Sequence, residues 1–114
     1  MPKTDLRYLG DMLDFSRRAI ALSSGMTRPE FEANDAVLWA CIHFIQVVGE
    51  GAFKTSAEFC EVHPEIPWEK IRATRHRIVH DYSNVDLDVI WDVIQQHLPA
   101  LVRQLEQLIP TDPE

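Results

Sequence analysis

The chain has 114 residues, 46% of them hydrophobic and 25% charged, as expected for one soluble globular domain, and its net charge is −7. Two cysteines, Cys41 and Cys60, are too few for a disulfide framework and favour a reduced, cytoplasmic chain. The first residues lead directly into a helical pattern without the apolar segment of an export signal, so no export is expected, and the apolar run from Val37 to Val48 is too short to span a bilayer.

The first predicted element is a helix from about Thr4 to Ser24, where apolar residues recur every three or four positions. Gly25 follows as its expected C-cap. The segment from Thr27 to Glu30 then has the spacing of a capping box, with proline in the first turn. It predicts a short helical turn.

Asn34 or Asp35 is the expected N-cap of a long helix that reaches to about Cys60. The first half of this helix is apolar nearly all round, which predicts a position at the centre of a bundle. Two prolines then predict a loop from His63 to Pro67, and the next helix is expected from Pro67 to about His80.

A turn at Ser83 and Asn84 precedes the last predicted helix, Leu87 to Ile109, which Asp86 can cap. Pro99 cannot donate a backbone hydrogen bond, so this helix should be kinked or split near Gln95 to Leu98.

No segment alternates with the period of a strand. The sequence therefore predicts an all-α protein: one domain over residues 1–114, built as an antiparallel bundle of four main helices plus the short helical turn. A frayed tail is expected from about residue 110.

The segment from Arg75 to Tyr82 is the strongest candidate for a chemical site, because it reads Arg, four residues, His, one residue, Tyr. A guanidinium gives a fixed charge for a phosphate, and an imidazole moves protons near neutral pH, as metal-free RNA cleavage requires. Residues 69–82 hold four cations against two carboxylates, a balance of +2 that leaves −9 for the rest of the chain. The four cations are Lys70, Arg72, Arg75 and Arg77.

On an ideal helix Arg75 shares a face with apolar side chains, so it needs a partner or a cleft, and Glu50 is the leading candidate for an ion pair. His80 lies about 140° further round the helix. The two side chains would meet if the helix ended before His80, or if two subunits packed around a two-fold axis.

Other interpretations of this segment remain open. His76 and His80 have the spacing of two metal ligands on one helix face, although Arg75 and Arg77 would repel a cation. The basic segment could also be one solvated helix face. Three tryptophans at helical positions are expected in the core or at a subunit interface: Trp39, Trp68 and Trp91.

The motif, late in a small helical chain, resembles the HEPN ribonuclease superfamily, specifically the HepT-like toxins of HEPN–MNT toxin–antitoxin pairs. The likeness extends over nearly the whole chain. It includes the segments Arg7 to Leu13, Val48 to Glu50, His63 to Trp68 and Val85 to Trp91. Gly51 departs from the family, which more often has alanine there; Trp39 and Cys41 are also unusual for this helix.

The resemblance implies a homodimer with metal-independent endoribonuclease activity, no cofactor and a 2′,3′-cyclic phosphate product. His80 would be the general acid or base and Arg75 would stabilise the transition state. In such type VII-like pairs an MNT-type nucleotidyltransferase antitoxin adenylylates the motif tyrosine, here Tyr82. The RNA substrate would be tRNA or mRNA. Four residues are expected to support catalysis or contact RNA: His76, Arg72, Arg77 and Glu50.

A different class of function remains open beside this one. The same basic segment would suit a catalytically inactive helical subunit that binds within a nucleotidyltransferase complex. Such a subunit would use the positive charge for binding without cleaving RNA.

Overall fold

The computed structural model describes residues 3–109, and every regular element in that range is helical. The all-α prediction is therefore confirmed over these residues, while the expected tail from residue 110 lies outside them. The elements are α1 (Lys3–Ser23), α2 (Arg28–Ala33), α3 (Asp35–Lys54), α4 (Ala57–Val62), α5 (Trp68–His80), η1 (Tyr82–Asn84), α6 (Leu87–Asp92), η2 (Val93–His97) and α7 (Leu98–Leu108).

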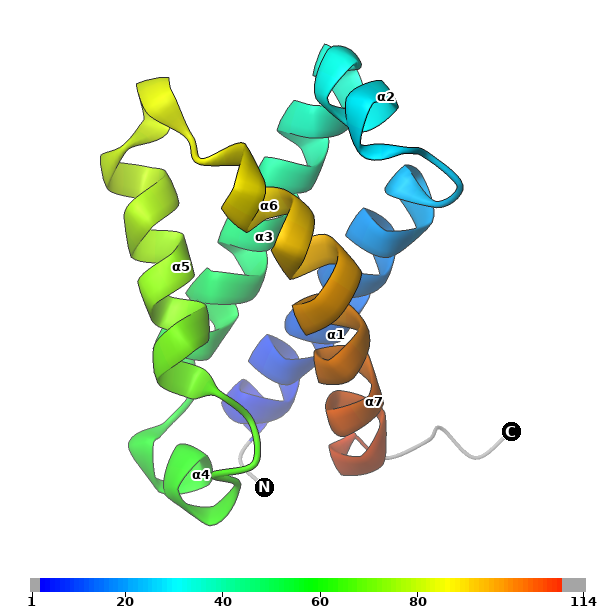
Figure 1. Cartoon of the computed structure of the whole chain (residues 1–114). Helices are drawn as coiled ribbons and strands as arrows, with labels where there is room; N and C mark the ends of the chain where they lie inside the picture. The colour runs from blue at the N-terminus through cyan, green and yellow to red at the C-terminus, as the bar shows by residue number, and fades with distance from the viewer. Residues whose placement is uncertain (1–2, 110–114) are drawn as a thin grey trace.

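The four long helical segments alternate in direction, as the prediction of an antiparallel bundle requires (Figure 1). Helices α1 and α5 run one way, whereas α3 and the segment from α6 to α7 run the other. Helix α3 packs against both α1 and α5, and α1 also packs against α7. The central position predicted for the long apolar helix is confirmed.

Helix α3 is long and apolar enough to cross a membrane by length and composition alone. Its apolar side chains, however, face the neighbouring helices of the bundle, and Leu38, Ile42, Ile45 and Val48 are buried. Such a helix is what the core of a small helical domain requires, because its neighbours cover it on several sides.

The prediction that this helix reaches Cys60 is wrong. It ends at Lys54, and Ser56 begins the separate helix α4 by accepting a hydrogen bond from Phe59 N at 3.2 Å. The buried Asp5 of α1 stabilises this break, because its carboxylate accepts from Ser56 N at 2.9 Å and Ser56 Oγ at 2.7 Å. A contact across the bundle thus overrides a sequence that would allow the helix to continue.

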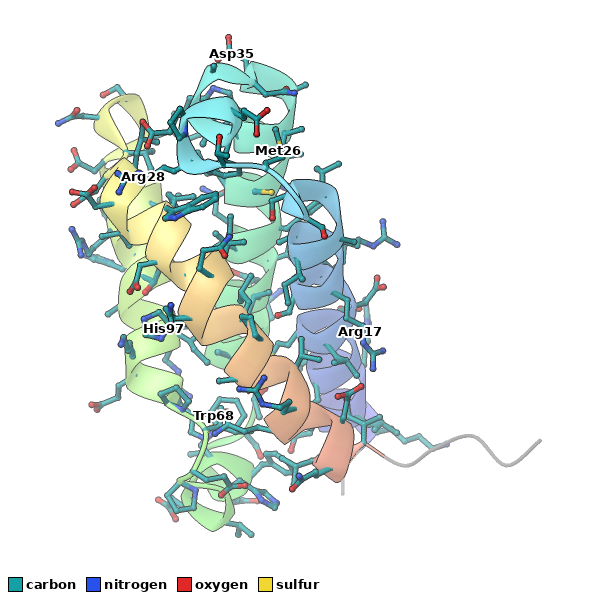
Figure 2. The ribbon with its side chains drawn as sticks, turned by 45° about the vertical axis from the view of Figure 1, so that its right-hand side comes forward. Arg17, Met26, Arg28, Asp35, Trp68 and His97 are labelled. Carbon is teal, nitrogen blue, oxygen red and sulfur yellow. The ribbon has the colours of Figure 1, made fainter. Side chains whose placement is uncertain are left out.

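The predicted caps and loops are otherwise confirmed. Gly25 follows α1 with a φ of 80°, a conformation that glycine adopts without strain. Thr27 and Glu30 form the reciprocal capping box at the start of α2. At the start of α5, Trp68 is buried and its indole N–H donates to His63 O at 2.9 Å (Figure 2).

The last helix changes geometry where Pro99 predicted a kink or split. Residues Val93–His97 form a π-helical turn in which Leu98 N donates to Val93 O, five residues back. Pro99 has no N–H to donate, and in a regular α-helix its ring would clash with the carbonyl of Gln95; a π turn accommodates both without ending the helix. Asp86 caps α6 as predicted, accepting from the backbone N–H groups of Asp88 and Val89.

Candidate active site

The Arg-x4-His-x-Tyr motif occupies the last turns of α5 and the short helix η1 that follows. Helix α5 continues through His80 and is closed by the hydrogen bond from Asp81 N to Arg77 O at 3.0 Å. Arg75 and His80 are therefore separated by ~140° around the helix and ~7.5 Å along it. The predicted extent of this helix, to about His80, is confirmed, and the alternative of an end before His80 is not found, so helix geometry directs these two side chains of one chain apart.

Arg75 lies at the contact between α5 and α3. Its Nη2 is 2.7 Å from Glu50 Oε2, which confirms the predicted ion pair, and its guanidinium lies over the Phe53 ring at 5.7 Å. Glu50 also pairs with Lys54 at 3.1 Å. Two cations thus share one carboxylate, and because 31% of the Arg75 side chain is exposed, the surplus positive charge is accessible to an anion.

Gly49 makes this placement possible. A Cβ atom at position 49 would lie 2.3 Å from the Cβ of Arg75, far inside van der Waals contact. The absence of a side chain therefore allows α5 to approach α3 closely enough for Arg75 to reach Glu50.

His80 and His76 lie on an exposed side of α5, with ring centroids 4.1 Å apart. Their spacing of four residues places one ring above the other, as expected for a helix. Among residues 3–109, no group of three or more His, Cys, Asp or Glu side chains could hold a metal ion. The arrangement is two neighbouring imidazoles, each accessible to solvent.

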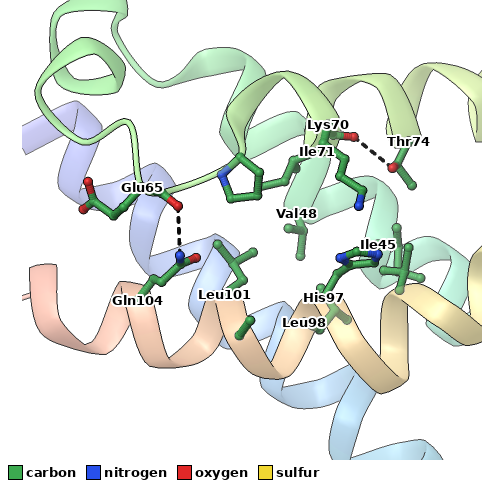
Figure 3. Close-up of a pocket in the computed structure, with 13 residues that line it drawn as sticks. Ile45, Val48, Glu65, Lys70, Ile71, Thr74, His97, Leu98, Leu101 and Gln104 are labelled. Atoms are coloured by element: carbon green, nitrogen blue, oxygen red, sulfur yellow. Dashed lines mark hydrogen bonds between the residues drawn. The ribbon is translucent and has the colours of Figure 1, made fainter.

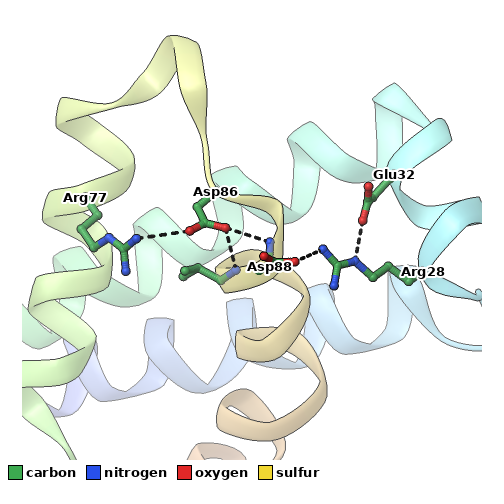
Figure 4. Close-up of polar contacts among 6 residues, drawn as sticks. Arg28, Glu32, Arg77, Asp86 and Asp88 are labelled. Atoms are coloured by element: carbon green, nitrogen blue, oxygen red, sulfur yellow. Dashed lines mark hydrogen bonds and ion pairs between the residues drawn. The ribbon is translucent and has the colours of Figure 1, made fainter.

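The two flanking arginines are engaged in different ways. Arg72 binds within the chain, donating to Ala52 O and to Cys60 Sγ, each at 3.2 Å. Arg77 is exposed, and its Nη2 is 3.4 Å from Asp86 Oδ2, the carboxylate that caps α6 (Figure 4). Arg72 therefore holds α5 against α3 and α4, whereas Arg77 is the more accessible of the two to a phosphate.

Figure 4 also shows the neighbouring ion pairs of Arg28, on the other side of α6. Arg28 contacts Glu32 and Asp88. The hydrogen bond that it donates to Glu32, followed by the one that it donates to Asp88, raises the pKa of its guanidinium. These contacts tie α2 to the start of α6 and do not involve the motif.

Tyr82 packs against Trp39, a contact that the sequence did not predict. The ring centroids are 5.4 Å apart with planes tilted by 43°, yet 59% of Tyr82 and 41% of Trp39 are exposed. Trp68 is buried, which confirms a core position for that tryptophan. Trp39 is not in the core, so the alternative of a subunit interface stays a prediction for this residue. The signal available in the sequence was that Trp39 shares a helix face with the polar residues His43, Gln46 and Glu50.

A cavity of about 210 Å³ lies between α5 and the segment η2–α7 (Figure 3). Its apolar wall includes Ile45, Val48 and Leu101, and Lys70 and His97 lie at its rim. Arg75, His80 and Tyr82 do not line it. The motif thus lies on a surface, separate from this cavity.

Comparison with known proteins agrees with the resemblance. Residues 8–108 match the family described as "Ribonuclease HepT-like". The chain is 28% identical over 110 residues to "Putative RNase MJ0127" of Methanocaldococcus jannaschii, covering 96% of this chain and 91% of that protein. It is 29% identical over 112 residues to "Probable ribonuclease HepT" of Thermococcus cleftensis, covering 95% and 98%. No solved structure matches the chain significantly.

The match spans α1 to α7 and includes the whole motif, so the similarity concerns the complete bundle and its candidate site together. The chain belongs to the ribonuclease HepT-like family of the HEPN superfamily.

Proposed function

We propose that this chain is the toxin of a type VII-like HEPN–MNT toxin–antitoxin pair, acting in the cytoplasm as a homodimeric, metal-independent endoribonuclease. Membership of the ribonuclease HepT-like family supports the general part of this proposal, namely that the chain is a ribonuclease. The observation that carries the proposal is the intact motif, with a positively charged Arg75–Glu50–Lys54 cluster and exposed His80 and Tyr82.

In the proposed reaction His80 removes the proton of a ribose 2′-hydroxyl. The 2′ oxygen attacks the adjacent phosphorus, the bond to the 5′ oxygen breaks, and that oxygen takes up a proton from water as it leaves. The RNA then ends in a 2′,3′-cyclic phosphate. Arg75 stabilises the additional negative charge on the phosphate oxygens, and Glu50 holds the guanidinium in place.

Two copies of the chain would form the complete site. Because Arg75 and His80 diverge on one continuous helix, we propose that Arg75 of one subunit and His80 of the other act on the same phosphate. The exposed Arg77 and His76 would contact neighbouring phosphates, and Arg72 would keep α5 in position.

An MNT-type nucleotidyltransferase antitoxin is the proposed partner, and Tyr82 the proposed site of adenylylation. The Tyr82 side chain is exposed, as a modifying enzyme requires. A phosphate attached two residues from His80 would repel RNA and obstruct the site. Mass spectrometry after co-expression tests this step, because AMP should be found on the peptide containing Tyr82 and be absent in Tyr82→Phe.

The test of catalysis uses total tRNA and mRNA in the presence of a chelator. Arg75→Ala and His80→Ala should each lower cleavage by about 10²–10⁴-fold. Arg17→Ala and His97→Ala remove the same side-chain types elsewhere and should leave cleavage unchanged. Equal cleavage by all variants would disprove the catalytic assignment, and loss of wild-type activity in the chelator would indicate metal dependence.

Mixing the two inactive variants tests the shared site. If Arg75 and His80 come from different subunits, each mixed dimer contains one intact site, and random pairing should restore about a quarter of wild-type activity. No recovery, with subunit exchange shown by differently tagged chains, would contradict a site shared in this way.

The second candidate is an inactive helical subunit of a nucleotidyltransferase complex. It is favoured by the separation of Arg75 and His80 within one chain. Stable binding to the transferase, with no cleavage and no toxicity from the wild-type chain, would support it over the nuclease.

A further inference from the structure

We infer that Trp39 and Tyr82 together form a stacking platform for an unpaired RNA base next to the site proposed above. This inference rests on the proposed function only for the identity of the ligand as RNA. The two rings come from different elements, α3 and η1, and are brought together by the fold.

The geometry leaves one side of each ring available. The centroids are 5.4 Å apart, too close for a base to enter between the rings, but both side chains are extensively exposed. A base would therefore stack on the outer surface of the pair. Every nucleobase has an aromatic face, so such a platform favours single-stranded RNA without requiring a particular sequence.

The surroundings favour a polyanion. On α3, Trp39 and Glu50 are eleven residues apart, about three helical turns, and therefore lie on the same side of that helix. The platform thus lies along the same face as the Arg75–Glu50–Lys54 cluster, which has one more cation than anion. An RNA phosphate bound at Arg75 would place the platform within reach of a base a few nucleotides away.

The other tryptophans do not offer this arrangement. Trp68 is buried at the start of α5, and Trp91 is half-buried against Phe31, with ring centroids 5.3 Å apart. Trp39 is therefore the exposed indole of the three, which makes fluorescence a direct probe of the platform. Adenylylation of Tyr82 would alter one of its two rings as well as add negative charge.

The binding test uses the full chain carrying His80→Ala, so that RNA is bound without the proposed cleavage. Fluorescence anisotropy measures its affinity for a labelled single-stranded RNA and for versions with one abasic position each. Adding Trp39→Leu should weaken binding of the intact RNA by about 5- to 150-fold, the effect of losing one stacked base. Trp39→Phe keeps an aromatic ring and should lose much less.

One abasic position should weaken binding by the same factor as Trp39→Leu, and the two changes together should cost no more than either alone. RNA should also quench tryptophan fluorescence, and Trp39→Phe should remove that quenching. Unchanged affinity of Trp39→Leu, additive effects at every abasic position, or no RNA binding at all would overturn the inference.

Two further measurements separate the possible failures. If the wild-type chain binds RNA through Trp39 but does not cleave it, the proposed nuclease fails and the platform stands. If it cleaves RNA and Trp39→Leu has no effect, only the platform fails. Sedimentation of folded Trp39→Leu provides the last check, because conversion of a dimer to a monomer would assign the ring pair to a subunit contact and overturn the inference.

Discussion

Helix α3 contacts α1 on one side and α5 on another, and the two contacts differ in chemistry. Toward α1 the packing is apolar and buried, with Leu9, Met12 and Ala52 fully inaccessible to solvent. Toward α5 it includes Arg72 and Arg75, both bound to groups on or beside α3. The comparison indicates that the side of α3 toward α1 forms part of the buried core, whereas the side toward α5 positions the charged groups of the candidate site.

Two glycines of α3 serve these two contacts. A Cβ at Gly51 would lie 2.5 Å from Met12 Cγ, whereas a Cβ at Gly49 would lie 2.3 Å from Arg75 Cβ. Packing thus explains the glycine at position 51, because Met12 occupies the space that a methyl group would need. The two positions allow the contacts to be tested separately.

The largest effect is expected from Met12→Ala, which should lower the free energy of unfolding by about 2–5 kcal/mol because it leaves a cavity in the core. Adding Gly51→Ala should recover part of the loss, since the new methyl group fills some of that cavity and alanine favours the helix. Urea denaturation followed by circular dichroism measures both variants. Strictly additive losses would contradict the packing explanation for Gly51.

Gly49→Ala should cost about 1–3 kcal/mol, because the methyl group would push α5 away from α3 at Arg75. It should also lower RNA cleavage per folded molecule, whereas the α1-side variant Gly51→Ala should leave cleavage per folded molecule nearly unchanged. Gly10→Ala is the matched control: nothing lies within 4 Å of its Cβ, and it should gain about 0.5–1 kcal/mol. Full cleavage by folded Gly49→Ala would show that the α3–α5 spacing does not control the site.

Asp5→Ala tests the end of the α1–α3 contact and should cost about 1–2 kcal/mol, because Ser56 loses the acceptor of both its N–H and its hydroxyl. Asp5→Asn retains a carbonyl oxygen and should cost less. Thermal unfolding measures the effect, with the exposed Asp11→Ala as the control. If Asp5→Ala unfolded at the same temperature as Asp11→Ala, the break between α3 and α4 would not depend on the Asp5 carboxylate.

The smallest effect concerns the two thiols, which lie on different sides of the bundle. Burial raises the pKa of the Cys41 thiol to about 11 from 9.0, so its thiolate is about a hundredfold scarcer than in an ordinary cysteine. Cys60 is half-buried beside Arg72. At pH 8, iodoacetamide should modify Cys60 in the native chain and Cys41 only after unfolding. Peptide mapping that finds equal rates would contradict a closed α1–α3 contact.

Much of this protein follows from local sequence. Periodic apolar residues, the Thr27–Glu30 capping box, the cap at Asp86 and the effect of Pro99 each depend on groups a few residues apart, and all were predictable. The ion pair of Arg75 with Glu50 could also be predicted, because a guanidinium on an apolar helix face needs a carboxylate partner.

Other features depended on contacts between distant segments. Asp5 of α1 binds Ser56 at the break between α3 and α4, and Trp39 of α3 contacts Tyr82 of η1. The sequence by itself determined the helices, their caps and the chemical groups of the motif, because short-range hydrogen bonding and periodic burial govern these. Tertiary structure alone decided that Trp39 contacts Tyr82 and that Asp5 binds Ser56, since residues so far apart in the sequence meet only through the packing of the helices.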